Sequence, residues 1–291
     1  MMKCYSNAAL RGLIMRNFFL LAMLIGCAGA YLVFASHQNL RVVRNDVVIS
    51  INAPNVRETS LLIAVIGDPH LPEGKEVISA FHELLLRVKS SNPDLVVFVG
   101  DYIADPSSIA DMPKHRELVI NAFKLVDPIP RAVVLGNYEN WSNAHDWFTD
   151  FKRLGVEVLE NQVAVLETKK GFVCVRGLGD KFTNRFEYVD YPRRCNSLPK
   201  LTLTHDPAGS FDPKVEGLVI AGHTHCGQVN VPFFGPLWVP TDAPPFAHCG
   251  LYQSGGRAVF VTSGVGTSIL PIRFGTQSGW DLLDLNINIK G

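Results

Sequence analysis

Short apolar runs recur along this 291-residue chain, and most of them stop at a glycine or a turn-forming polar residue. Valine, isoleucine and leucine runs bounded in this way are typical of buried strands. Between the runs, apolar residues repeat at helical spacing on one face. Strands alternating with such helices predict a central sheet covered by helices, so we expect an α/β fold. We expect strands at 61–66, 95–99, 132–135, 156–159, 163–166, 173–176, 201–203, 218–221, 259–262 and 282–289, and helices at 77–88, 118–126 and 147–154.

The composition supports a globular protein. Hydrophobic residues make up 47% of the chain and charged residues 19%, which is enough apolar material for a packed core and excludes a disordered or fibrous protein. The 27 Lys and Arg residues balance the 27 Asp and Glu residues, so we expect no nucleic-acid partner. Residues 60–291 contain no visible repeat or boundary, and we expect a single domain there.

The N-terminal part carries an uncharged segment at residues 18–35, preceded by the basic residues Lys3, Arg11 and Arg16. A run of about 18 apolar residues just reaches the length that crosses a bilayer as a helix. Three interpretations are open: a signal anchor, a signal peptide cleaved near residues 28–30, and a lipoprotein lipidated at Cys27. We favour the anchor because the apolar run continues past both cleavage sites.

This interpretation predicts a single-pass protein of the cell inner membrane. Its parts are a basic cytoplasmic N-terminus at 1–17, a transmembrane anchor at 18–36, a linker at 37–59 and a catalytic domain at 60–291. The basic residues before the span weakly favour a domain outside the cytoplasm.

Metal-binding residue types follow several of the predicted strands. The carboxyl edge of such sheets is where ligands bind in open α/β folds. Carboxylates and neutral imidazoles without thiolates suit Mn, Fe or Zn. A carboxylate such as Asp101 can bridge two cations, which then clamp a phosphoryl group and activate water. We therefore expect a dinuclear phosphoester hydrolase whose metal-binding residues are Asp68, His70, Asp101, Asn137, His205, His223 and His225.

These residues stand in motifs that resemble the calcineurin-like metallophosphoesterase superfamily over about residues 60–285. The motifs are Gly67-Asp68-Pro69-His70, Gly100-Asp101, Gly136-Asn137, His205 and Gly222-His223-Thr224-His225. Residues 222–228 (GHTHCGQ), with 264–268 and 270–274, resemble its membrane-anchored bacterial YkuE/YaeI-like branch.

The resemblance implies a four-layer α/β/β/α sandwich, preceded here by the transmembrane helix, and a metal-held hydroxide as the attacking group. It also implies two divalent metal ions, with Asp101 bridging them. One ion is assigned to Asp68, His70, Asp101 and His225, and the other to Asp101, Asn137, His205 and His223.

The chain departs from the family at Tyr138, where a histidine usually contacts the scissile phosphate and assists the leaving group. A tyrosine hydroxyl can donate a hydrogen bond to a phosphoryl oxygen but is a poor acid at neutral pH. One hypothesis is a phosphodiesterase or pyrophosphatase with Asn137, Tyr138 and His205 as catalytic residues and Tyr138 contacting the substrate. The alternative is a catalytically weakened domain that serves as a binding module. We favour the enzyme because the ligand set is complete.

The substrate prediction follows from the leaving group and from a resemblance: the lipid A pathway hydrolases that cleave UDP-2,3-diacylglucosamine include enzymes that resemble this domain and in which that histidine is also replaced. UDP-2,3-diacylglucosamine, a lipid-linked nucleotide of lipid A biosynthesis, loses a phosphate monoester, which needs little protonation. We expect a phosphoester substrate of this kind and no obligate protein partner.

Two further features have alternative interpretations. The apolar, proline-broken segment 231–240 either forms a lipid-facing lip beside the site or packs its aromatic rings into the core. Cys226 is interpreted as a small apolar core residue. Cys226 and the three cysteines at 174, 195 and 249 can pair if the domain is exported.

Overall fold

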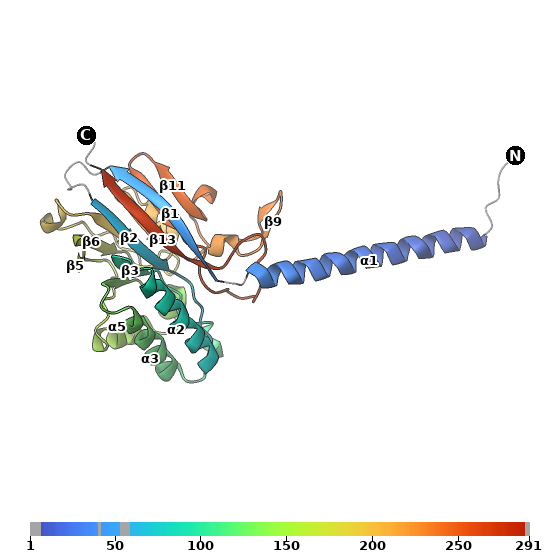
Figure 1. The fold of residues 1–291 in the computed structure, drawn as a ribbon, viewed down its shortest axis with the longest axis horizontal. Helices are drawn as coiled ribbons and strands as arrows, with labels where there is room; N and C mark the ends of the chain where they lie inside the picture. The colour runs from blue at the N-terminus through green and yellow to red at the C-terminus, as the bar shows by residue number, and fades with distance from the viewer. Residues whose placement is uncertain (1–6, 40–41, 53–58, 289–291) are drawn as a thin grey trace.

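A computed structural model describes residues 7–39, 42–52 and 59–288 of the chain. A long N-terminal helix projects from a sandwich of sheets and helices (Figure 1). The helices are α1 (Asn7–Asn39), α2 (Lys75–Ser90), α3 (Met112–Ala122), α4 (Asn137–Trp141) and α5 (Ala144–Arg153), with the 3-10 helices η2 (Phe123–Val126), η4 (Pro207–Phe211) and η5 (His225–Gly227) among the shorter turns. The strands are β1 (Val43–Asn52), β2 (Thr59–Ile66), β3 (Leu95–Phe98), β4 (Arg131–Val133), β5 (Gln162–Thr168), β6 (Gly171–Gly177), β7 (Lys200–Leu203), β8 (Gly217–Ala221), β9 (Asn230–Val231), β10 (Gly235–Pro236), β11 (Gly250–Ser254), β12 (Arg257–Val261) and β13 (Gly279–Asn288).

Two large sheets enclose the main core. The first has the order β1-β13-β2-β3-β4, the second has the order β11-β12-β8-β7-β6-β5, and β9 and β10 form a separate ribbon. Ile63 and Val97 of the first sheet belong to the same buried cluster as Leu203 and Ile220 of the second. The sheets therefore pack face to face, because alternate side chains of each strand point into the space between them.

Helices cover the other face of the first sheet. One face of α2 is buried, as the spacing of its apolar residues predicts, and Phe81 and Leu85 on that face join a second core cluster. Phe123 of η2 stacks on Phe98 of β3 in the same cluster, with ring centroids 4.0 Å apart. The predicted α/β sandwich is confirmed in its helix layer and its two sheets.

The outer face of the second sheet has a different cover. Val219 of β8 points outward and packs beside Phe186 of a loop, and Ala221 packs beside Phe211 of η4. Between α5 and residue 288, the described chain contains 3-10 helices and no α-helix. The fourth layer of the sandwich is thus built from loops and short turns.

The strand directions bring particular strand ends together. Strands β2, β3 and β4 are mutually parallel, and so are β6, β7, β8 and β12. The carboxyl ends of each parallel set lie at one edge of their sheet. The backbone N–H of His223, after β8, donates to Asp68 Oδ1, after β2, over 2.9 Å. The two edges therefore meet, and the residues following these strands share one site.

The segment 37–59, expected as a linker with some strand character, contains a complete strand: residues 43–52 form β1 and pair with all of β13. Burial alternates along this strand: Val47 and Ile49 pack into the core between the sheets, and Val48 between them is exposed. The predicted strand at 156–159 is wrong, since Val158 makes only a single bridge to Val133. Val156 and Leu159 are apolar because they fill the core beside β4, not because they extend a sheet.

Helix α1 is the one helix of the described chain that is long and apolar enough to cross a membrane. Within α1, the part with this length and apolar character is Ile14–Tyr31, and none of it is buried against the rest of the protein. Length and composition are the evidence for a span, and they agree with the segment expected from the sequence.

The role of β1 is testable by a pair of neighbouring substitutions. Ile49→Ala is expected to lower the free energy of unfolding by about 2–5 kcal/mol, because the side chain is 0% exposed and its removal leaves a cavity. Val48→Ala, at a side chain that is 66% exposed, is expected to change it by less than about 0.5 kcal/mol. Urea unfolding of the full chain in detergent, followed by tryptophan fluorescence, measures both. Equal effects would show that residues 43–52 are not part of the core.

Candidate metal centre

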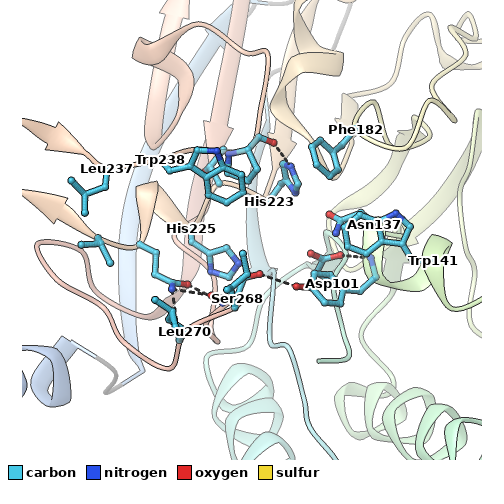
Figure 2. A pocket seen from close by; sticks show the side chains of 16 residues that line it. Asp101, Asn137, Trp141, Phe182, His223, His225, Leu237, Trp238, Ser268 and Leu270 are labelled. Atoms are coloured by element: carbon cyan, nitrogen blue, oxygen red, sulfur yellow. Dashed lines mark hydrogen bonds between the residues drawn. The ribbon is translucent and has the colours of Figure 1, made fainter. Parts of the chain in front are cut away.

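Six side chains form two adjacent groups with metal-binding geometry. The ligand atoms of Asp68, His70 and His225 lie within 4.8 Å of one another, and the same holds for Asp101, His205 and His223. Figure 2 shows Asp101 facing His223 and His225 across the site. All six residues are buried.

Asp101 lies between the two groups. Its Oδ2 atom is 3.3 Å from His205 Nε2 in one group and 3.6 Å from His70 Nε2 in the other. Asn137 adds its amide, with Oδ1 3.1 Å from His205 Nε2. The seven residues singled out from the sequence therefore converge, and Asp101 has the position that a bridging carboxylate requires.

The backbone turns sharply as it leaves each strand. Asp68, His70, Asp101, His223 and His225 all have φ between 43° and 69°, in the left-handed region that is uncommon outside glycine. Such conformations cluster at functional sites, where the surrounding structure maintains them. Here they aim the side chains over the sheet edge.

Two glycines permit close packing at the site: Gly136, which precedes Asn137, and Gly222, which precedes His223. A Cβ atom on Gly136 would lie 2.3 Å from Asp101 Oδ1, and one on Gly222 would lie 2.5 Å from Asp68 Oδ2. Neither distance is possible for a real side chain. The Gly-Asn and Gly-His dipeptides thus reflect a steric requirement of the site.

Hydrogen bonds to carbonyl groups orient two of the imidazoles. His205 Nδ1 donates to the Val99 carbonyl at 2.7 Å, and His223 Nε2 donates to the Pro240 carbonyl at 2.5 Å. Because a carbonyl only accepts, each ring is protonated on the nitrogen that faces it, and in the neutral ring the remaining nitrogen has its lone pair for the site. These two nitrogens, His205 Nε2 and His223 Nδ1, face each other at 3.1 Å. Facing lone pairs repel unless a positive charge lies beside them, so the donor set fits a cation.

A second observation supports the fit to metal ions. Asp68 Oδ2 is buried and has no hydrogen-bond partner among the described residues. Leaving a buried carboxylate oxygen unpaired is costly, and a cation removes that cost.

The electrostatics place several groups in a metal-binding protonation state. Burial lowers the pKa of His70 to about 4 and lowers the pKa of His225 well below its usual value, so both rings are neutral. Burial opposes ionisation of Asp101, but the nearby histidines, His205 foremost, outweigh it and bring its pKa to about 2. Neutral imidazoles and an ionised carboxylate are the forms that bind divalent metals.

Two further groups, Asp68 and His205, are shifted toward holding a proton. Burial raises the pKa of Asp68 to about 7. Burial opposes the charged form of His205, yet the carboxylates of Asp101 and Asp68 outweigh it and raise the pKa of this histidine. The negative charge of Asp68 and Asp101 thus attracts a cation to the site, which can be a proton or a metal ion.

Tyr138 lies at the wall of the site. Its ring packs edge-on against His70, with centroids 4.7 Å apart, and its hydroxyl is 3.0 Å from Ser268 Oγ. Burial raises the pKa of this hydroxyl, so it stays protonated and can donate. The position agrees with the substrate-contacting role predicted from the sequence.

Glu139 supports the site, a role that no sequence motif predicts. Its carboxylate accepts the backbone N–H groups of Asp101, Tyr102 and Gly136 at 2.8, 2.8 and 2.9 Å. Burial raises its pKa to about 8, while the N–H donors favour the ionised form. This carboxylate joins the turn after β3 to the start of α4, and so positions Asp101 relative to Asn137.

Arg273 is the second supporting residue without a predicted role. The guanidinium is fully buried, and Nη2 donates to His225 Nδ1 at 3.0 Å and to the carbonyls of Ser263 and Gly266 at 2.7 Å each. It therefore holds the His225 ring and the loop before β13 together. In the sequence, Arg273 lies in segment 270–274, one of the segments that resemble the YkuE/YaeI-like branch.

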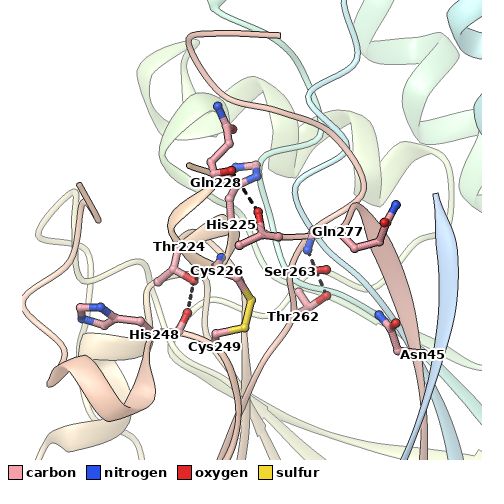
Figure 3. Close-up of a disulfide and its surroundings, with 12 residues drawn as sticks. Asn45, Thr224, His225, Cys226, Gln228, His248, Cys249, Thr262, Ser263 and Gln277 are labelled. Carbon is pink, nitrogen blue, oxygen red and sulfur yellow. Dashed lines mark hydrogen bonds between the residues drawn. A yellow bond between two sulfur atoms is a disulfide. The ribbon is translucent and has the colours of Figure 1, made fainter. Parts of the chain in front are cut away.

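A disulfide also braces His225. Cys226 is bonded to Cys249, directly beside His225 (Figure 3), and Cys174 is bonded to Cys195. Thr224 donates through Oγ1 to the carbonyl of His248 at 2.6 Å, which adds a second link between the same two segments. The interpretation of Cys226 as a simple core residue is wrong, because its sulfur crosslinks the metal-site loop.

A pocket of about 290 Å³ opens beside the metal-binding residues. Asp101, Asn137 and His223 form its polar floor, and the remaining wall is largely apolar (Figure 2). The apolar part includes Trp141, Phe182, Val229, Leu237, Trp238, Pro240, Ile269 and Leu270.

Comparison with known proteins identifies the family. Residues 61–227 match the calcineurin-like phosphoesterase family. The chain belongs to this family. The metallophosphoesterase YkuE of Bacillus subtilis is 28% identical over 73% of this chain and 74% of its own length. Phosphodiesterase YaeI of Escherichia coli is 29% identical over 66% of this chain and 70% of its own length. A transmembrane protein with a metallophosphoesterase domain from Danio rerio is 26% identical over 75% of this chain and 51% of its own length.

These matches confirm the superfamily and the YkuE/YaeI-like branch predicted from the motifs. The protein is a metal-dependent phosphoesterase, and the family implies divalent metal ions at the residues described above.

The role of Arg273 is testable by its effect on metal affinity. Arg273→Met is expected to weaken Mn²⁺ binding about 10- to 100-fold, because loss of a residue that orients a metal ligand has effects of this size. The measurement is metal content by elemental analysis after dialysis at graded free Mn²⁺.

Arg257→Met is the matched control. Arg257 also donates to backbone carbonyls, those of Asp212 and Val215, but away from the site. Both variants are expected to lose thermal stability, and only Arg273→Met should lose metal affinity. Unchanged affinity in Arg273→Met would show that the arginine only supports the fold.

Proposed function

We propose that this protein is a membrane-anchored phosphodiesterase or pyrophosphatase with two divalent cations, Mn, Fe or Zn. The observation that carries the proposal is the convergence of seven N and O donor residues, with Asp101 between the two groups and Asp68 Oδ2 unpartnered. When bound, the ions supply Lewis-acid stabilisation of the phosphoryl group and lower the pKa of water. Asp68, His70, Asp101 and His225 hold one ion, and Asp101, Asn137, His205 and His223 hold the other.

The residues of the chain bind and orient the substrate. Tyr138 donates a hydrogen bond to a phosphoryl oxygen, and Asn137 and His205 position the reacting phosphate at the centre. Since the Tyr138 hydroxyl has a raised pKa, it assists the leaving group little. The site therefore favours leaving groups that need no proton, such as the phosphate monoester released from a diphosphate.

The apolar wall of the pocket favours substrates that carry a lipid chain. UDP-2,3-diacylglucosamine combines a diphosphate with acyl chains and is one candidate, which requires a domain on the cytoplasmic face of the inner membrane. The two disulfides favour the opposite side, since disulfides persist in oxidising compartments. We therefore place the catalytic domain outside the cytoplasm, and favour a lipid-linked phosphodiester or diphosphate of the outer leaflet.

Activity on a generic substrate tests the chemistry. The full chain in detergent with Mn²⁺ is expected to hydrolyse bis-p-nitrophenyl phosphate, whose leaving group needs no protonation. Asp101→Asn keeps an oxygen to accept the Tyr138 N–H but loses the bridging charge. It should lower kcat/KM by more than about 100-fold, the upper end for residues that only support a ligand. Retained turnover in Asp101→Asn would contradict the two-metal proposal.

The same assay separates a working tyrosine site from a binding module. Tyr138→His is expected to change turnover of the aryl diester by less than about tenfold, because little acid assistance is needed. A large gain from an undetectable baseline would support a domain that has lost catalysis.

Membrane sidedness is testable with paired reporters. Alkaline phosphatase fused to the C-terminus is expected to be active, and green fluorescent protein at the same position is expected to be dark, because each folds on one side of the membrane only. An inactive alkaline phosphatase fusion together with a fluorescent green fluorescent protein fusion would show that the domain is cytoplasmic, and would favour UDP-2,3-diacylglucosamine as the substrate.

A further inference from the structure

An exposed apolar surface surrounds the mouth of the pocket. Phe233, Phe234, Leu237 and Trp238 come from the β9–β10 segment, and Ile269, Leu270 and Ile272 come from the loop before β13. We call these seven residues the apolar rim. Exposed apolar side chains are usually scattered singly on monomeric proteins, whereas a contiguous group marks an interaction site. The alternative that the aromatic rings of 231–240 fill the core is wrong for these side chains.

Gln228 joins the two halves of the rim. Its side-chain Nε2 donates to the carbonyls of Ser268 and Leu270 at 3.0 Å each, and its Oε1 accepts the N–H of Ser268 at 2.8 Å. Val229 follows Gln228 in the chain, and its carbonyl accepts the N–H of Leu237 at 3.0 Å. The rim is therefore one built surface, although its halves are distant in the sequence.

The rim lies on the side of the domain where α1 enters. Val43 begins β1 and donates its N–H to the carbonyl of Ser278 at 3.0 Å. The four peptide steps from Asn39, the end of α1, to Val43 span at most about 14 Å. Ile272 is separated from Ser278 by at most about 21 Å of extended chain. In Figure 1, β9 and the end of α1 lie on the same side of the domain.

The composition of the rim suits a lipid surface. Segments 229–240 and 263–272 contain no Asp, Glu, Lys or Arg, so no charge has to leave water when they approach hydrocarbon. Tryptophan prefers the boundary between headgroups and acyl chains, and Trp238 lies in the rim. A partner protein would more often meet a polar margin with arginine and hydrogen-bonding groups.

We propose that the apolar rim inserts into the surface of the bilayer that α1 spans, so that the metal site opens onto the membrane. The proposal deepens the proposed function, on which it rests for the lipid nature of the substrate. At about 290 Å³ the pocket is at the small end for ligand sites, so it holds the phosphate group and adjoining atoms while the lipid tail stays in the bilayer. The rim closes the path between bilayer and pocket to water.

Insertion is measurable without reference to activity. The full chain is reconstituted into phosphatidylcholine–phosphatidylglycerol nanodiscs with and without lipids brominated near the headgroup end of the acyl chains. Bromine quenches tryptophans at that depth. Trp238→Phe is expected to remove most of the emission that bromine quenches. Trp141→Phe is the control and is expected to leave the quenched emission unchanged. The two side chains are similarly exposed, Trp238 at 62% and Trp141 at 57%. Equal quenching in wild type and Trp238→Phe overturns the proposal.

A second pair of variants tests the consequence for catalysis. Phe233→Ser with Phe234→Ser alters rim residues that do not line the pocket. This double variant is expected to keep its rate on bis-p-nitrophenyl phosphate within about twofold. It is expected to lose about tenfold or more on p-nitrophenyl hexadecyl phosphate carried in the nanodisc, because less apolar surface is buried. Phe172→Ser, at an exposed position on β6, should leave both rates unchanged.

The outcomes separate the two proposals. Trp238-dependent quenching without hydrolysis of the hexadecyl ester supports insertion and overturns the lipid substrate. Hydrolysis of both esters without Trp238-dependent quenching supports the phosphodiesterase and overturns insertion. Loss of self-association in the double variant, detected by mass photometry, with quenching unaffected would assign the rim to a second copy of the chain and overturn insertion.

Discussion

The metal-binding site depends on one close approach between the two sheets, the hydrogen bond from the His223 N–H to the Asp68 carboxylate. This contact joins the end of β2 to the end of β8 and places the residues after both strands at one point. It is possible because Gly222 lacks a side chain where a Cβ atom would strike Asp68. The large core between the sheets holds these edges in register, so the energy of apolar burial maintains a group of polar residues that would otherwise repel one another.

Much of this arrangement could be predicted because it depends on local pattern. Apolar runs that end at glycine mark strand ends, and parallel strands bring their ends to one edge, so Asp68, Asp101 and His223 could be grouped from the sequence alone. The supporting residues could not. Glu139 and Arg273 act through backbone groups that only the folded chain brings near, and nothing in the spacing of the cysteines distinguishes Cys226–Cys249 from other pairings. Strand β1 was missed because its partner, β13, lies at the far end of the chain.

The supporting residues converge on His225 from three directions. Arg273 holds the His225 ring. The Cys226–Cys249 disulfide holds the residue after His225, and Thr224, the residue before it, donates to the carbonyl of His248. The same short segment continues to Gln228, which organises the apolar rim. The position of the metal ligand and the shape of the pocket mouth are thus parts of one rigid unit. Only two residues separate Gln228 from the metal ligand His225, so a change in the rim that displaced Gln228 would act on the loop that carries this ligand.

The proposed substrate and the proposed contact with the membrane explain how a weak acid at Tyr138 can suffice. A poor leaving group needs a proton in the transition state, whereas a phosphate monoester can leave without one. In the proposed arrangement, the apolar walls of the pocket and a lipid surface at its mouth lower the local polarity, which strengthens the interaction between cations and phosphate. Selection of the substrate then rests on what the membrane contains and on how good its leaving group is. For the proposed diphosphate substrate, a hydroxyl that only positions the phosphoryl oxygen is sufficient, and a histidine in its place is not required.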